Sequence, residues 1–93
     1  MSARPPVADE LRERLSVLAP TRLELTDDSA LHAGHPGAAG GGGHFRIAIT
    51  SMSFSGRNRL ERHRLVYAAV GDLVPGRVHA LAIDARAPGE PGA

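Results

Sequence analysis

The side chains best suited to chemistry in this 93-residue sequence are its histidines. A neutral imidazole nitrogen is a common metal donor, and His79 stands at the start of an apolar strand pattern that would hold its ring rigidly. His32 and His35 have H-x-x-H spacing but lie in a glycine-rich stretch that fixes neither ring. The alternatives are a core-edge His79 satisfied by one backbone hydrogen bond, and two solvated loop histidines. His44 opens a strand pattern and is expected to be exposed.

The sequence contains no cysteine. A disulfide framework, a thiolate zinc finger, a cysteine nucleophile and a self-contained thiolate iron-sulfur site are therefore excluded. Any sulfur ligand of a metal must come from a partner molecule.

The second group of interest is a cluster of basic side chains. The formal net charge is only +1, which is too small for strong nonspecific attraction to nucleic acid. A local patch could still bind phosphates or an acidic partner, or it could be a solvated helix face neutralised by nearby carboxylates. The cluster consists of Arg57, Arg59, Arg62, His63 and Arg64. The three aromatic residues are too few for a platform that stacks single-stranded bases.

Catalysis has no positive signal in the sequence. No nucleophile, base and orienting group can be assembled, and there is no G-x-S-x-G elbow. The chain has no lysine, so a G-x-x-x-x-G-K phosphate loop is absent as well. An enzyme is therefore the least favoured class.

The length and composition predict one soluble domain that begins with an amphipathic helix. Val7, Leu11, Leu15 and Leu18 recur at helical spacing, and Pro20 predicts that the helix ends near Leu18. Residues 1–6 and 88–93 are expected to be disordered tails around a domain spanning 7–87. No signal or transit peptide is recognised, which predicts a cytoplasmic protein without a membrane segment.

Strand patterns with alternating apolar side chains cover residues 22–26, 45–50 and 78–85, and a helical pattern covers 58–73. The predicted order is α-β-β-α-β, with an antiparallel first strand pair and a parallel second pair joined by the helix. Arg62 falls inside the apolar stripe of that helix. Either the helix starts late or Arg62 reaches past the sheet. Residues 27–43 are rich in glycine and predict a long mobile loop of the kind that often carries function.

From Leu23 to Pro88 the chain resembles the BolA family. The resemblance rests on Phe54-Ser55-Gly56, on Arg62-His63-Arg64-Leu65-Val66-Tyr67, and on Val78-His79-Ala80-Leu81-Ala82-Ile83. It implies a KH-like type II fold, α-β-β-α-α-β with a three-stranded mixed sheet, and a short extra helix near residues 55–59.

The resemblance also implies partnership with a monothiol glutaredoxin and a [2Fe-2S] cluster shared with that protein and its glutathione. The family's strand-start ligand falls on His79 and its loop ligand on His32, with the neighbouring His35 left open as the second donor. A histidine in the loop marks the BolA-one-like subgroup. His63 matches another histidine of the family, and the role that the resemblance implies for it is structural rather than metal-binding. Imidazole in place of thiolate raises a cluster's potential and makes occupancy depend on pH, and a donor on a loose loop suits transfer or sensing.

Two other functions stay open. One is a nucleic-acid-binding transcriptional regulator that uses the arginine cluster, although Gly56-Arg57-Asn58-Arg59 lacks the second glycine of a G-x-x-G clamp. The other is an adaptor that binds glutaredoxin through the same arginines without sharing iron. DNA binding and a weak homodimer are likewise left open.

Overall fold

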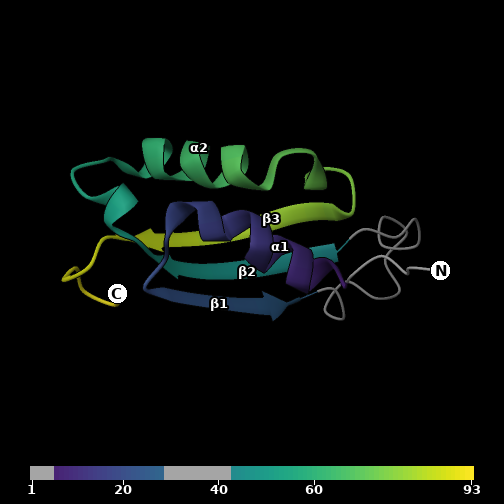
Figure 1. Ribbon diagram of the computed structural model, residues 1–93, viewed down its shortest axis with the longest axis horizontal. Coiled ribbons are helices and arrows are strands. Elements are labelled where there is room, and N and C mark those ends of the chain that lie inside the picture. Colours follow the sequence, from purple (N-terminus) through teal and green to yellow (C-terminus); the bar gives the residue numbers. More distant parts are fainter. Residues whose placement is uncertain (1–5, 29–42) are drawn as a thin grey trace.

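The computed structural model describes residues 6–28 and 43–93. Its elements are α1 (Val7–Leu15), β1 (Arg22–Asp27), β2 (Gly43–Thr50), α2 (Arg59–Val70) and β3 (Val78–Arg86). Short 3₁₀ helices follow α1, β2 and α2, over Ser16–Leu18, Met52–Phe54 and Gly71–Leu73. Two helices and a three-stranded mixed sheet confirm the predicted α+β class (Figure 1). Within the described ranges, no helix is long and apolar enough to cross a membrane.

The sheet has the strand order β1-β2-β3, with β2 in the centre. β1 pairs with β2 in antiparallel fashion, and β2 pairs with β3 in parallel fashion, as the sequence predicts. Ile47 at the centre of β2 lies opposite Leu25 of β1 and Ile83 of β3. The alternating side chains of the three strands therefore place one apolar face on the same side of the sheet.

The helices cover that apolar face. α1 crosses in front of the sheet, and α2 runs alongside β3 (Figure 1). The fully buried apolar side chains come from α1, the sheet, α2 and the connection from β2 to α2: Leu11, Leu15, Ile47, Ile49, Phe54, Val66, Val70 and Val78. The apolar stripe of α1 predicted from residues 7–18 thus packs into the core that joins both helices to the sheet.

The connection between β2 and α2 differs from the one that the family resemblance implies. A 3₁₀ helix over Met52–Phe54 stands in place of the short extra helix expected near residues 55–59. The Ser51 hydroxyl accepts a hydrogen bond from the Ser53 N–H at its start, and Gly56 follows with a positive φ of 73°. That turn leaves only Arg57 and Asn58 before α2 begins.

α2 begins at a capping box. The Asn58 side chain accepts from the Glu61 N–H at 2.8 Å, and the Glu61 carboxylate accepts from the Asn58 N–H at 2.9 Å. These bonds satisfy donors that would otherwise be unpaired in the first turn. The helix therefore starts early, and the first explanation considered for Arg62, a late start, is wrong.

Ser51 ties the end of β2 to the end of the first helical segment. Its side chain is buried, donates to the Leu18 carbonyl and accepts from Ser53 N–H. Ser51→Ala should lower the free energy of unfolding by about 1–3 kcal/mol, because both hydrogen bonds of a buried hydroxyl are lost. Urea denaturation measures this change. Ser55→Ala, at an exposed position four residues later, is the control and should stay within about 0.5 kcal/mol of the parent. Equal losses in the two variants would contradict the assignment.

Candidate metal and anion sites at the two ends of strand β3

His79 lies at a bulge near the start of β3. Gly43 of β2 is opposite Val78, whereas the next residue, His44, is opposite Ala80, so His79 is the extra residue between them. Val78 is fully buried and His79 is exposed. The sequence prediction that His79 shares the apolar face of Leu81 and Ile83 is therefore wrong, because the bulge breaks the alternation. The exposed ring also argues against the core-edge alternative.

His44 lies next to His79. The centroids of the two rings are 5.1 Å apart, with their planes inclined by 42°. Two histidines bound to one tetrahedral metal have centroids roughly 5 Å apart, because each nitrogen lies about 2.1 Å from the metal. The start of β2 and the start of β3 thus bring two imidazoles together, and only one of them was predicted as a ligand.

The loop histidines predicted as the second donor, His32 and His35, lie outside the described residues. Asp28 and Gly43, which flank that segment, are both at this end of the sheet. The Asp28 N–H donates to the His44 carbonyl at 2.7 Å, and the Gly43 N–H donates to the Arg77 carbonyl at 3.3 Å. The described residues on either side of positions 29–42 therefore lie at the end of the sheet that carries the two rings.

Within the described residues, His44 and His79 do not by themselves complete a metal site. Among residues 6–28 and 43–93, no three His, Cys, Asp or Glu side chains gather in a group that could hold a metal ion. An iron of a [2Fe-2S] cluster needs two ligands besides its bridging sulfides, and two imidazoles on one iron with thiolates on the other form a known ligand set. His79 fits such a cluster only if a partner supplies the sulfur.

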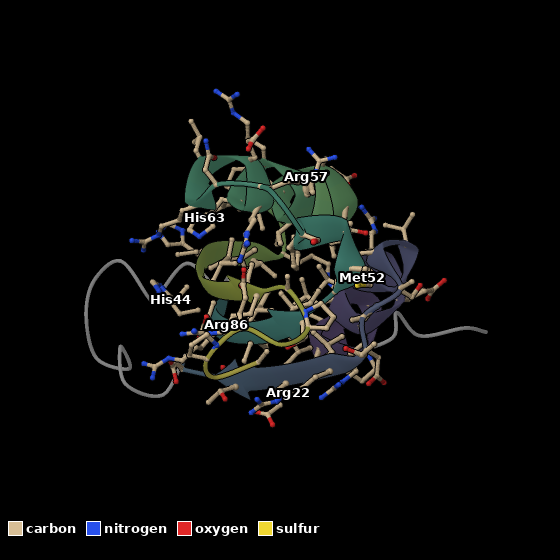
Figure 2. All side chains as sticks on the ribbon, turned by 90° about the vertical axis from the view of Figure 1, so that its left-hand side faces the viewer. Arg22, His44, Met52, Arg57, His63 and Arg86 are labelled. Carbon is tan, nitrogen blue, oxygen red and sulfur yellow. The ribbon has the colours of Figure 1, made fainter. Side chains whose placement is uncertain are left out.

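The predicted arginine cluster lies at the opposite end of β3. A cleft of about 530 Å³ opens between the start of α2 and the end of β3. We call it the arginine cleft; its lining residues are Arg57, Arg59, Arg62, His63, Ile83, Asp84, Ala85, Arg86 and Glu90. Figure 2 shows Arg57 and His63 beside α2, with Arg86 below them on the sheet. The structure brings together four of the five predicted residues, while Arg64 is exposed outside the cleft.

Arg62 is the innermost cation of the arginine cleft, with only 13% of its side chain exposed. Its two terminal nitrogens donate to the two oxygens of Glu90 at 2.7 and 2.8 Å. It also donates to the backbone carbonyls of Ala85 at 3.1 Å and Arg57 at 2.9 Å. Arg62 therefore reaches the end of β3 and Glu90 beyond it, which agrees with the second explanation, that its side chain reaches past the sheet.

Glu90 anchors the C-terminal segment. Its carboxylate also accepts from the Ala87 N–H at 2.9 Å, and the segment after β3 forms turns. Residues 88–93 thus differ from the disordered tail that their Pro and Gly content predicts, because Arg62 provides a tertiary partner. The paired Arg62 guanidinium, followed by the Ala87 N–H, lowers the pKa of Glu90 from 4.5 to about 2.

The other three arginines of the arginine cleft differ in whether a carboxylate pairs with them. Arg86 pairs with Asp84 at 2.9 Å. Arg57 donates to the Ser53 carbonyl at 3.0 Å. Within the described part of the chain, no carboxylate forms an ion pair with Arg57 or Arg59. The cleft thus carries two paired and two unpaired guanidinium groups, an excess of positive charge.

The two candidate sites are well separated. His79 and Ala85 are six positions apart on one strand, which corresponds to roughly 20 Å at about 3.3 Å per residue. His44, which appears on the same side as His63 in Figure 2, lies opposite Ala80 and so belongs to the far end of the sheet. Variants at one site should therefore leave the other intact.

Comparison with known proteins places this arrangement in a family. The family model described as BolA-like protein matches residues 15–90. The human BolA-like protein 1 is 45% identical over 86 residues, which cover 91% of this chain and 61% of the relative. The BolA domain of SufE1 from Arabidopsis thaliana has a TM-score of 0.77 at 37% identity, covering 92% of this chain and 96% of that one. The solution structure of mouse BolA1 has a TM-score of 0.73 at 43% identity, covering 95% and 70%.

The α-β-β-α-β chain with a histidine at the start of its last strand belongs to the BolA family. The chain spans about three fifths of the length of the BolA-like protein 1 relatives that it matches.

Two features of these sites had no usable signal in the sequence. His44 was expected only to be exposed, because a parallel register that puts it beside His79 cannot be read from either strand alone. Glu90 stands between Gly89 and Pro91 in a segment without periodicity, so its pairing with Arg62 depends entirely on the tertiary fold.

Glu90→Gln should make the protein less stable than the parent at neutral pH. The low pKa of Glu90 means that its stabilisation is complete above about pH 5 and is lost as the pH falls through about 2. Melting temperatures of parent and variant should therefore converge between about pH 5 and pH 2. Glu13→Gln, which removes an exposed carboxylate from α1, is the matched control. A constant difference between parent and variant across this range would show that the ion pair is not its source.

Proposed function

We propose that the chain is a non-enzymatic partner of a monothiol glutaredoxin, with which it shares a [2Fe-2S] cluster for iron-sulfur cluster trafficking or iron-status signalling. Membership of the BolA family and the exposed ring of His79 support this proposal. The absence of cysteine assigns all sulfur ligands to the glutaredoxin and its glutathione. The single observation that carries the proposal is the bulge, which turns His79 outward at a rigid strand.

His79 would donate one imidazole nitrogen to the cluster, and the loop would supply a second from His32 or His35. The ring beside His79 makes His44 a competing donor that the sequence did not suggest. Cytoplasmic location stays an expectation; two plant relatives bear names that include chloroplastic or mitochondrial.

His79→Ala should abolish the change in visible circular dichroism when the chain is added to a [2Fe-2S]-loaded monothiol glutaredoxin, because the cluster then loses its strand ligand. His63→Ala removes an imidazole at the other end of the molecule and should leave the change intact. Both variants should retain the far-ultraviolet spectrum of the parent. An unchanged visible signal with His79→Ala would contradict the proposal.

The second donor can be identified by three further single variants in the same titration. Of His32→Ala and His35→Ala, one should lose most of the signal and the other should keep it, whereas His44→Ala should keep it. If His44→Ala alone lost the visible circular dichroism change, the second donor would lie at the start of β2, and a loop ligand would be refuted.

The nucleic-acid alternative has weaker support from the site. Arg62 is committed to Glu90, and two of the three aromatic residues, Phe45 and Phe54, are buried in the core. If about four arginines did contact phosphates, the logarithm of the DNA affinity should fall with the logarithm of salt with a slope near -3.6. A DNA affinity that does not fall with salt at this slope excludes the nucleic-acid alternative.

An adaptor that uses these arginines without iron would engage a glutaredoxin about 20 Å from His79.

A further inference from the structure

The arginine cleft has the size and charge of a small-molecule site. Its volume of about 530 Å³ lies within the range of roughly 300–1,000 Å³ that such sites occupy. Its lining includes the apolar residues Ile83 and Ala85, and β3 is the edge strand of the sheet formed by the described residues. The walls are cationic. The cleft is therefore shaped for a compact ligand that carries negative charge.

The ion pairs inside the cleft determine how much positive charge is left for the ligand to balance. Glu90 balances Arg62 and Asp84 balances Arg86. Arg57 and Arg59 remain at the opening, where no described carboxylate pairs with either. Two unbalanced guanidinium groups match a dianion, and guanidinium is the side chain that best matches the geometry of phosphate oxygens.

The same cleft fits a nucleic-acid strand poorly. A phosphodiester carries one charge, and the residues that line the cleft include no Phe, Tyr or Trp. His63 is the one ring in the lining, so successive bases would find no extended stacking surface. A phosphate monoester has a second pKa near 6 and so carries nearly two negative charges at neutral pH.

We propose that the arginine cleft binds a small phosphate monoester through Arg57 and Arg59, and that Glu90 competes with this ligand for Arg62. In the structure Glu90 already makes the bidentate contact that a phosphate would make with Arg62. The C-terminal segment then acts as an internal competitor that weakens binding. This site is independent of the histidines at the start of β3.

The probe is glycerol 3-phosphate at pH 7.5, followed by amide chemical shifts of the intact chain. Saturable shifts should be confined to the start of α2 and the end of β3. Arg59→Gln should weaken binding about tenfold, the effect of losing one charge-assisted contact. Arg64→Gln removes the same charge from the same helix outside the cleft and is the matched control; it should leave affinity unchanged.

Glu90→Gln should strengthen binding severalfold, because Arg62 becomes available to the phosphate. The comparison of Arg59→Gln with Arg64→Gln remains decisive if Glu90→Gln loosens the C-terminal segment. Two further ligands distinguish the source of the phosphate: dimethyl phosphate, a monoanionic diester, and a short single-stranded oligonucleotide. Equal weakening by Arg59→Gln and Arg64→Gln, absence of saturation, or tighter binding of either diester ligand would overturn the proposal.

Discussion

The parallel pairing of β2 with β3 is the interaction on which the rest of the structure depends. Parallel neighbours need a crossover, and α2 provides it on the face that carries Phe45, Ile47 and Ile49. The same pairing puts the starts of both strands at one end of the sheet, where the rings of His44 and His79 lie side by side. It also places the end of β3 against the first turns of α2, where Arg62 reaches the Ala85 carbonyl.

One strand therefore carries two candidate sites, one at each end. Its first residues present imidazole nitrogen, a ligand for a borderline metal such as iron, at the end of the sheet where Asp28 and Gly43 also lie. Its last residues, with α2 and Glu90, present guanidinium groups suited to oxyanions. The core between them is filled by aliphatic side chains, Phe45 and Phe54.

Much of this fold could be predicted because its signals are local. Leu23 and Leu25 alternate with polar residues, and Phe45, Ile47 and Ile49 alternate with polar or small ones; such period-two patterns specify half-buried strands. The bulge at His79 could not be predicted, because one extra residue in a ladder depends on the partner strand and leaves no mark on composition.

The candidate sites were predictable only in part, because contacts between distant parts of the chain leave no local signal in the sequence. The sequence indicated His79 and the arginine cluster, but the contacts of His44 and of Glu90 are long-range pairings. His32 and His35 lie outside the described residues, so their part in any site stays a prediction.

The most direct test of the central claim is pulsed electron paramagnetic resonance of the reduced complex with a monothiol glutaredoxin. This chain would carry ¹⁵N-labelled histidine, and the glutaredoxin would carry nitrogen of natural abundance. We expect hyperfine coupling between the cluster and a ¹⁵N nucleus, since only this chain holds the label. A cluster spectrum without any ¹⁵N coupling would show that no histidine of this chain binds iron.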